Sequence, residues 1–287
     1  MAKASATSDE SVPSEPHSSF FSLPRLYLSF VSRKVFSFTQ TLYGLGAFTL
    51  ITLVVMLKKN RHASRVIHPL VRSQIERAGL SMLPMTSFLG FALGLVIIGQ
   101  TVFILNRVGF TAYTGTIMVT VVVRELGPMI AALLVLARVG TAIVIELGTS
   151  RAFGEVEALE ALGIDPVHFF VVPRVVGLAL SIFALTIYLI LTALVSGYLF
   201  AFLQDVPLRP FDYFNQLASA LTWQDFALLA LKTTLFGIII AIVTCYQGLA
   251  QPLAIEEVAA ATTRAVAHSV VACVLLDALF IVVYLVM

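Results

Sequence analysis

Charged residues are scarce in this sequence. Asp, Glu, Lys and Arg make up 12% of its 287 residues, whereas 59% are hydrophobic. Soluble domains contain about twice that charged fraction. The apolar residues are gathered into long runs, and a run of roughly 20 helical residues can cross a hydrocarbon layer about 30 Å thick. The composition therefore excludes a water-soluble fold and predicts an all-α integral membrane protein.

Signs of redox, metal and nucleotide sites are also missing from the sequence. The two cysteines, Cys245 and Cys273, lie in apolar stretches, where cysteines usually serve as packing residues. There is no GxxxxGKS or GxxxxGKT phosphate loop, so we do not expect this chain to bind ATP itself. No inverted repeat of the kind that builds many secondary transporters is evident either. We expect neither a cofactor nor a metal in this chain.

The amino-terminal part is polar and then basic. Residues 1–19 are rich in Ser, Pro and Glu without an apolar run, which predicts a disordered cytoplasmic tail and not a signal peptide. Residues 20–80 are expected to form an interfacial or re-entrant helix followed by a basic cytoplasmic segment. A nucleic-acid partner is not expected, because the basic cluster adjoins the membrane and no compact domain presents it. The cluster comprises Arg25, Arg33, Lys34, Lys58, Lys59, Arg61, Arg65, Arg72 and Arg77.

Residues 81–287 are expected to form a membrane domain of five spans. The apolar runs predict these spans at 81–105, 111–147, 173–202, 223–246 and 266–286. Within the first span, Gly90 and Gly94 have the GxxxG spacing, which lets a second helix approach closely. Basic residues concentrate in alternate loops, so the positive-inside rule predicts a cytoplasmic amino end and an external carboxyl end.

Several charges lie within these predicted spans. An ionised side chain in hydrocarbon costs several kcal/mol unless it is paired or faces water. The mid-span charges are expected either to neutralise one another and fix helix packing, or to line a cavity and change partners during transport. They are Arg124, Glu125, Lys232 and Asp277. Closer to the cytoplasm, Arg138 and Glu146 are eight residues apart, on about the same face of a helix, and are expected to stabilise its cytoplasmic end.

The cytoplasmic segment 148–166 is acidic, whereas such loops are usually basic. Val156, Leu159 and Leu162 recur at helical spacing, which predicts a short amphipathic helix over 151–162 that ends at Gly163. This helix could be an ordinary hairpin helix that packs on its own bundle, or a docking helix for a cytosolic partner.

Two stretches of the sequence resemble a known family. Residues 121–176 read VVVRELGPMIAALLVLARVGTAIVIELGTSRAFGEVEALEALGIDPVHFFVVPRVV, and residues 261–277 read ATTRAVAHSVVACVLLD. Both resemble motifs of the MlaE/YrbE-type permeases, the membrane subunits of ABC transporters that work with MCE-domain proteins in lipid trafficking. The similarity extends from about residue 65 to the end of the chain.

The resemblance implies a homodimer in the bacterial inner (cytoplasmic) membrane, with the amino end cytoplasmic and the carboxyl end periplasmic. It implies that separate cytosolic ABC ATPase subunits bind ATP and Mg, so that this chain is a transporter permease subunit and not an enzyme. It further implies a periplasmic ring of MCE-domain proteins, with phospholipid moving between the inner membrane and the periplasm or outer membrane. Outer-membrane lipid asymmetry is the process that such systems serve.

The resemblance also implies roles for particular residues. Arg124 and Glu125 match the charged pair of the family's RELGP motif, and Lys232 matches a basic residue of its fourth span. The segment 151–164 becomes an ATPase-coupling helix, and two departures from the family lie on this cytoplasmic face, at Phe153-Gly154-Glu155 and at Ala260. The implied coupling residues are Arg151, Glu155, Glu157, Leu159, Glu160 and Asp165, and the implied substrate-binding residues are Ile97, Gln100, Ile104 and Leu105.

Two functions from other classes remain as alternatives. A stand-alone proton- or ion-coupled secondary transporter would use Glu125 and Asp277 as its titrating groups. A scaffold that only anchors an MCE complex would need no cavity in the membrane, and neutral replacements of Arg124 or Glu125 would leave its function unchanged.

Overall fold

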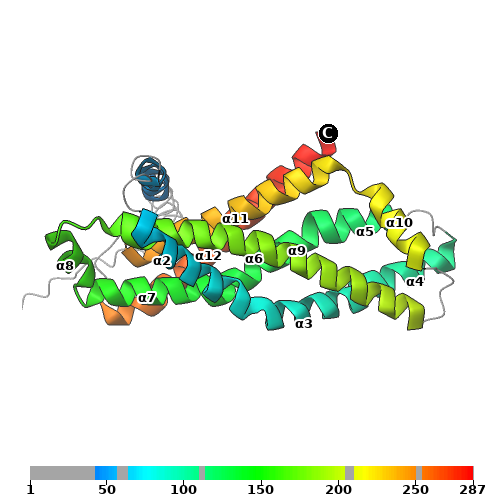
Figure 1. Cartoon of the computed structure of the whole chain (residues 1–287), viewed down its shortest axis with the longest axis horizontal. Helices are drawn as coiled ribbons and strands as arrows, with labels where there is room; N and C mark the ends of the chain where they lie inside the picture. Colours follow the sequence, from blue (N-terminus) through cyan, green and yellow to red (C-terminus); the bar gives the residue numbers. More distant parts are fainter. Residues whose placement is uncertain (1–42, 57–63, 110–113, 204–209, 250–253, 287) are drawn as a thin grey trace, which may run out of the picture. The chain divides into compact units, whose positions relative to one another are not determined.

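The computed structural model describes residues 43–56, 64–109, 114–203, 210–249 and 254–286, and within these ranges the chain contains helices and turns but no strand (Figure 1). The chain divides into two compact units, Met1–Gly46 and Ala47–Met287. The expected tail at 1–19 lies outside the described residues, as does the first part of the expected interfacial segment. The second unit contains all of the predicted membrane domain.

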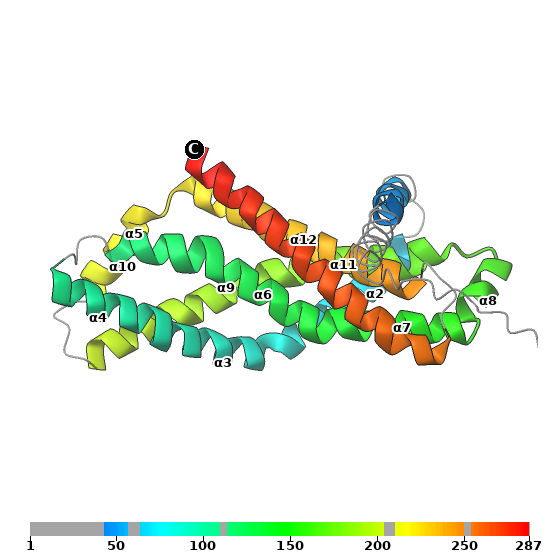
Figure 2. The same ribbon diagram turned by 180° about the vertical axis from the view of Figure 1, so that it is seen from behind.

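Five helices are long and apolar enough to cross a membrane: Ile67–Leu105, Gly115–Ala152, Val167–Phe200, Trp223–Leu249 and Ile255–Val286. They confirm the predicted all-α fold with five spans. A further apolar helix, Tyr43–Met56, is shorter than these five and lies within the segment expected to be interfacial or re-entrant. Figures 1 and 2 show α8 and α10 at opposite ends of the spanning helices.

The first span begins earlier than residue 81. It comprises α2 (Ser64–Ala78), η1 (Leu80–Met82), α3 (Leu83–Leu93), the π-helical η2 (Gly94–Ile98) and α4 (Gly99–Val108). The sequence did not indicate that α2 belongs to this span, because charged residues interrupt its apolar pattern. Among them, Arg72 and Glu76 form an exposed ion pair, while α2 packs on α9. Pro84 lies in the first turn of α3, where its missing N–H leaves no helical hydrogen bond unmade.

The second span contains two π-helical segments. Its elements are α5 (Thr114–Met118), the π-helical η4 (Val119–Leu126), α6 (Gly127–Val135), the π-helical η5 (Leu136–Gly140) and α7 (Thr141–Ala152). The wider turn of η5 lies around Arg138, so the α-helical spacing that predicted a shared face for Arg138 and Glu146 does not apply. Glu146 contacts two other helices instead, through Arg174 at 3.2 Å and Arg77 at 3.7 Å.

The remaining elements begin with α8 (Glu155–Ala161), η6 (Val167–Val171) and α9 (Val172–Leu203), which is a single 32-residue helix. The segment expected to be a loop, 203–222, contains α10 (Pro210–Ala220). Tyr213 of α10 is buried and its hydroxyl donates to the Leu194 carbonyl oxygen at 3.3 Å; burial raises the pKa of this hydroxyl above its usual range. The last elements are α11 (Trp223–Leu249), η7 (Ile255–Glu257) and α12 (Val258–Val286), so the fifth span also begins before the expected residue 266.

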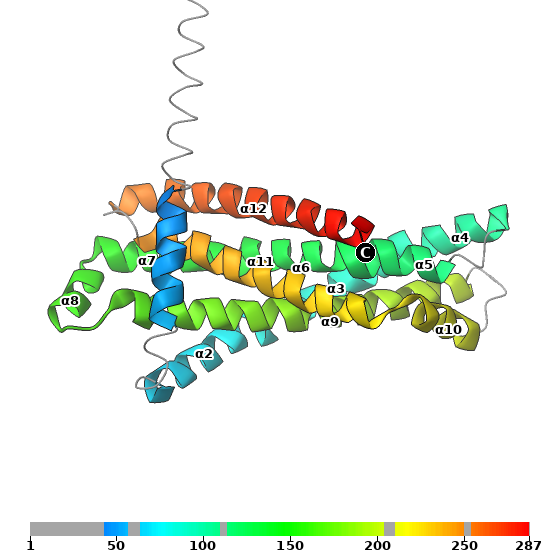
Figure 3. The ribbon, with the colours of Figure 1, turned by 90° about the horizontal axis from the view of Figure 1, so that it is seen from above.

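Helix α9 is the centre of the packing. It contacts α2, α3, α6 and α11, and Figure 3 shows α11 and α12 side by side. The predicted close approach at the GxxxG motif is confirmed, because α9 passes directly over Gly90 and Gly94. A Cβ on Gly94 would meet the Ser196 side chain and would lie 2.9 Å from the Ala193 carbonyl carbon.

Replacing Gly94 with alanine should therefore lower the free energy of unfolding by about 1 to 3 kcal/mol, because the added methyl group forces η2 away from the α9 backbone. Thermal unfolding of the purified protein in detergent measures this change. Gly46→Ala is the matched control, since Gly46 lies on an exposed part of helix Tyr43–Met56. Equal stability of the two variants would contradict close packing at the motif.

Candidate functional site

The side chain of Lys232 on α11 is fully buried and carries an ammonium group. Its Nζ atom lies 2.6 Å from Asp277 Oδ1 on α12 and 2.9 Å from Glu125 Oε2 on η4. It also donates to the backbone carbonyl oxygen of Arg124 at 2.9 Å. Nζ thus donates hydrogen bonds to Glu125 and to the Arg124 carbonyl and forms an ion pair with Asp277. The second, fourth and fifth spans meet at this group.

Pro128 lies two residues after the end of the π-helical η4 at Leu126. Proline has no N–H, so Pro128 cannot donate a hydrogen bond to the Arg124 carbonyl four residues earlier. The order Arg-Glu-Leu-Gly-Pro supplies Lys232 with a carboxylate and a carbonyl from adjacent residues.

The Arg124 side chain belongs to a second ion pair. Its Nε atom lies 2.8 Å from Asp225 Oδ1, and Asp225 is 3% exposed. The guanidinium carbon also lies 5.0 Å from the ring centroid of Tyr284 on α12. The predicted mid-membrane charges thus come together, but as a group of three, Lys232 with Glu125 and Asp277, beside a separate ion pair of Arg124 with Asp225.

Asp225 is a member of the cluster that the sequence reasoning missed. Its other oxygen, Oδ2, accepts the backbone N–H of Thr222 at 2.9 Å and the Thr222 hydroxyl at 2.8 Å. Threonine followed three residues later by an acid, just before an apolar run, is the pattern of a capping box at a helix start. That pattern in Thr222-Trp-Gln-Asp225 could have identified the position.

Three members of the cluster lie at similar depths on three helices. Lys232 follows Trp223 by nine residues, and Asp277 precedes Val286 by nine, which is about 14 Å of helix from each end. Arg124 follows Gly115 by nine residues in the second span. Half of a hydrocarbon layer measures about 15 Å, so these three residues lie near the middle of the membrane. Asp225 lies nearer the boundary, in the first turn of α11. Across the cluster two cations face three carboxylates, so one carboxylate is in excess.

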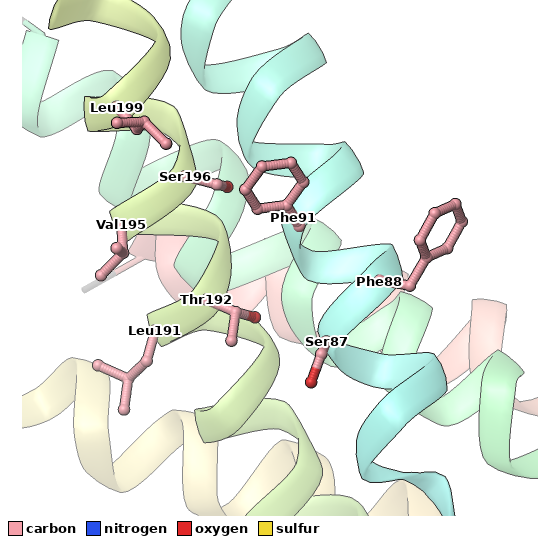
Figure 4. A pocket seen from close by; sticks show the side chains of 8 residues that line it. All are labelled: Ser87, Phe88, Phe91, Leu191, Thr192, Val195, Ser196 and Leu199. Carbon is pink, nitrogen blue, oxygen red and sulfur yellow. The ribbon is translucent and has the colours of Figure 1, made fainter.

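A separate apolar cavity of about 540 Å³ lies between α3 and α9 (Figure 4). Phe91 of α3 and Ser196 of α9 lie toward each other in this view. The Ser87 hydroxyl is 2.7 Å from the Tyr188 hydroxyl, so it is already hydrogen-bonded. The lining residues are Ser87, Phe88, Phe91, Leu191, Thr192, Val195, Ser196 and Leu199.

The four residues predicted to bind substrate lie farther along the first span and do not line this cavity. Ile97 packs against the buried core, and Leu105 is half-buried. Gln100 and Ile104 are exposed and, four residues apart, share one face of the helix with exposed Val96. Their role in binding substrate stays a prediction that requires a partner on this open face.

The predicted cytoplasmic helix is present as α8, which is shorter than expected because Arg151 and Ala152 belong to α7. Gly154 separates the two helices with φ of 74°, a conformation that favours glycine. At the other end, Gly163 with φ of 75° donates to the Glu160 carbonyl at 2.9 Å, and Ile164 donates to the Leu159 carbonyl at 3.0 Å. This Schellman motif confirms Gly163 as the residue that ends the helix.

The surface of α8 is acidic with apolar residues at its borders. Val156 is buried and Leu159 half-buried, whereas Glu155, Glu160 and Leu162 are exposed. Two of the predicted coupling residues pair with each other, because Arg151 Nε lies 3.2 Å from Glu157 Oε1. Asp165 follows the helix, and its Oδ1 atom accepts the Val167 backbone N–H at 3.1 Å, at the start of the third span.

Removing the cation of the cluster should be costly. Lys232→Met leaves Glu125 and Asp277 buried without a counter-charge and should lower the free energy of unfolding by about 3 to 5 kcal/mol. The variant that also carries Glu125→Gln and Asp277→Asn removes all three charges together and should regain most of this loss. Denaturant unfolding in detergent compares the two. Wild-type stability of the single Lys232→Met variant would show that the cluster does not hold the spans together.

Comparison with known proteins places this arrangement in a family. The family model described as Permease MlaE matches residues 71–283, which include every member of the charge cluster, the apolar cavity and α8. The chain is 28% identical over 239 residues to a probable ABC transporter permease protein of Rickettsia prowazekii, covering 83% of this chain and 90% of that protein.

Two further relatives carry more specific names. One is the intermembrane phospholipid transport system permease protein MlaE of Haemophilus influenzae, 24% identical over 249 residues, which are 85% of this chain and 91% of that protein. The other is the chloroplastic protein TRIGALACTOSYLDIACYLGLYCEROL 1 of Arabidopsis thaliana, 27% identical over 224 residues, which are 77% of this chain and 62% of that protein. Because the family match spans most of its length, this chain belongs to the MlaE permease family and is a membrane subunit of a transporter, not an enzyme.

Proposed function

We propose that this chain is the permease subunit of an ABC-type phospholipid transporter in a bacterial inner membrane. The observation that carries the proposal is the family match over residues 71–283, which includes the charge cluster, the apolar cavity and α8. The Haemophilus relative is named for intermembrane phospholipid transport, and this supports a phospholipid as the substrate class. Separate subunits supply the ATPase activity and the MCE-domain ring.

The apolar cavity between α3 and α9 suits the acyl part of such a substrate. Its volume of about 540 Å³ lies within the range of about 300 to 1,000 Å³ that is common for ligand pockets. Phe88 and Val195 at its border are 75% and 60% exposed, so the cavity opens toward the lipid-facing surface of this chain. An acyl chain can enter it sideways without crossing a polar barrier.

A second copy of the chain would complete the part of the substrate path that lies along the first span. The exposed stripe of Val96, Gln100 and Ile104 offers apolar contact and one amide. Facing a second copy, this stripe would line a shared cavity in the homodimer, as predicted for Gln100 and Ile104. The Gln100 amide would then contact the polar linkage region of a phospholipid.

Energy would enter the permease through α8. A cytosolic ABC ATPase with a basic and apolar docking surface would complement the exposed carboxylates of Glu155 and Glu160 and the exposed side chains of Phe153 and Leu162. Because α7 continues into the span that carries Arg124 and Glu125, a displacement of α8 would move residues at mid-membrane. The MCE-domain ring would contact the opposite end, where α10 lies.

The charge cluster would then have two tasks. In the resting permease it fixes the second, fourth and fifth spans relative to one another. During transport Arg124 and Glu125 would exchange partners, or contact a headgroup, as α6 and η4 move with α7. Arg124 suits this task, because about a quarter of its side chain is exposed while its guanidinium group forms an ion pair with Asp225.

A single charge reversal on α8 tests the coupling. Glu160→Lys should lower permease-dependent stimulation of the partner ATPase by about tenfold, because it places a cation in the centre of the docking surface. Glu160 suits this test better than Glu157, whose carboxylate is already paired with Arg151. ATP hydrolysis and lipid transfer by the reconstituted complex are the measurements.

Glu256→Lys is the matched control for this prediction, since Glu256 is an exposed acid just before α12. It should leave both activities unchanged. Wild-type coupling in the Glu160→Lys complex would contradict docking on α8.

The alternative of a stand-alone proton- or ion-coupled carrier is favoured by one observation. Glu125 and Asp277 share the single cation Lys232, so one of the two carboxylates could exchange a proton. Transport by the lone chain in liposomes under a proton gradient supports this alternative. Transport that requires the ATPase and ATP supports the permease.

A further inference from the structure

A second group of ion pairs lies near the α8 end of the spans, about 30 Å along the second span from Arg124. Its centre is the carboxylate of Glu146 on α7. The Oε2 atom of Glu146 lies 3.2 Å from Arg174 Nη2 on α9 and 3.7 Å from Arg77 Nη1 on α2. The first, second and third spans therefore meet at one carboxylate.

The buried member of this group is Arg174, which is 4% exposed. Its Nη1 atom donates to the Phe170 carbonyl oxygen one turn earlier at 2.8 Å, and its guanidinium carbon lies 5.5 Å from the Phe170 ring centroid. These contacts hold the guanidinium in place on its own helix. A buried cation without a counter-charge is strongly destabilising, and Glu146 supplies that counter-charge from another helix.

The ion pair of Glu146 with Arg174 joins two helices that pack mainly on other elements. Apart from its neighbours in sequence, α7 packs on α11 and α12, whereas α9 packs on α2, α3, α6 and α11. The chain itself connects α7 to α9 through α8 (Figure 1), which has a glycine in the left-handed conformation at each end, Gly154 and Gly163. Glycine turns deform easily, so the ion pair is the firmer of the two connections.

The two helices lead to different parts of the substrate path. Helix α7 continues along the second span to Arg124 and Glu125. Helix α9 carries one wall of the apolar cavity, including Leu191 and Val195. A displacement of α8 that moved α7 alone would change the charge cluster while the cavity kept its shape. With Glu146 paired to Arg174, both helices must move together.

The cytoplasmic end of the first span is attached to the same unit. Helices α2 and α9 approach closely, because a Cβ on Gly177 of α9 would lie 2.6 Å from Gln74 Cβ of α2. The contact of Arg77 with Glu146 is exposed on both sides and contributes little by itself. Beyond α2 and η1, the span continues as α3, which carries the other wall of the cavity.

We infer that Glu146 and Arg174 are positioning residues of the transport cycle. Their ion pair makes α7 and α9 move together when the ATPase displaces α8, so that the charge cluster and the apolar cavity change in the same step. The inference rests on the proposed function and deepens it, because it identifies the residues that carry the displacement of α8 to both parts of the substrate path.

The variant Glu146→Gln with Arg174→Met tests this inference in the reconstituted complex. It removes both charges together, so that no unpaired charge is left buried. Stimulation of the ATPase should stay at the wild-type level, because α8 is unchanged. The amount of lipid transferred per ATP hydrolysed should fall about tenfold, within the usual range of coupling between distant sites.

A conservative variant separates the role of the ion pair from the mere presence of a folded helix. Arg174→Lys keeps a cation beside Glu146 and should retain most of the lipid transfer per ATP. The matched control is Arg72→Gln with Glu76→Gln, which removes an exposed ion pair within α2 and should change neither activity.

Thermal unfolding in detergent identifies any variant that fails to fold. If the variant with methionine is unstable, Glu146→Gln with Arg174→Gln repeats the measurement with polar side chains at both positions. Wild-type lipid transfer per ATP in the folded double variant would overturn the inference, as would an equal loss of ATPase stimulation and transfer. Both outcomes leave the proposed function standing, since that depends on ATP-driven phospholipid transfer by the wild-type complex.

Discussion

One buried ammonium group must be neutralised by neighbouring oxygens, and this requirement constrains the membrane core of the protein. Lys232 is fully buried on α11, and a charge at that depth is tolerated only when oxygens surround it. Two carboxylates and a carbonyl come from η4 and α12, so three spans must keep their positions relative to one another. The constraint extends to Asp225, which neutralises the Arg124 side chain.

Under the proposed function, this arrangement separates the place where substrate is handled from the place where energy enters. The apolar cavity and the charge cluster lie within the spans, whereas α8 lies beyond them with its carboxylates exposed. Helix α7 and the π-helical segments η5 and η4 connect α8 to Arg124 along one continuous span. π-helical turns often occur at functional sites, and two of them in this span give it places at which a displacement of α8 can change the helix register. The permease needs no chemistry of its own.

The sequence predicted the five spans, the mid-membrane charges and the end of α8 at Gly163, because each depends on local composition or on a short pattern. It missed the early start of the first span, where exposed Arg72 and Glu76 obscured an amphipathic helix. It also missed α10, whose buried Tyr213 is explained only by contacts with distant residues such as Leu194. The pairing of Glu146 with Arg174 depends on the π-helical turn of η5, which nothing in the residue pattern indicated. The cavity between α3 and α9 likewise arises from two helices that are about 100 residues apart in sequence.

The central claim is that this chain handles phospholipid inside the membrane with energy supplied by another subunit. Native mass spectrometry of the intact complex, extracted gently from its own membrane, tests it most directly because it reports protein subunits and bound lipids together. We expect two copies of this chain with an ATPase subunit and with phospholipid bound. A chain that is purified alone, transports under a proton gradient and carries no phospholipid would contradict the claim.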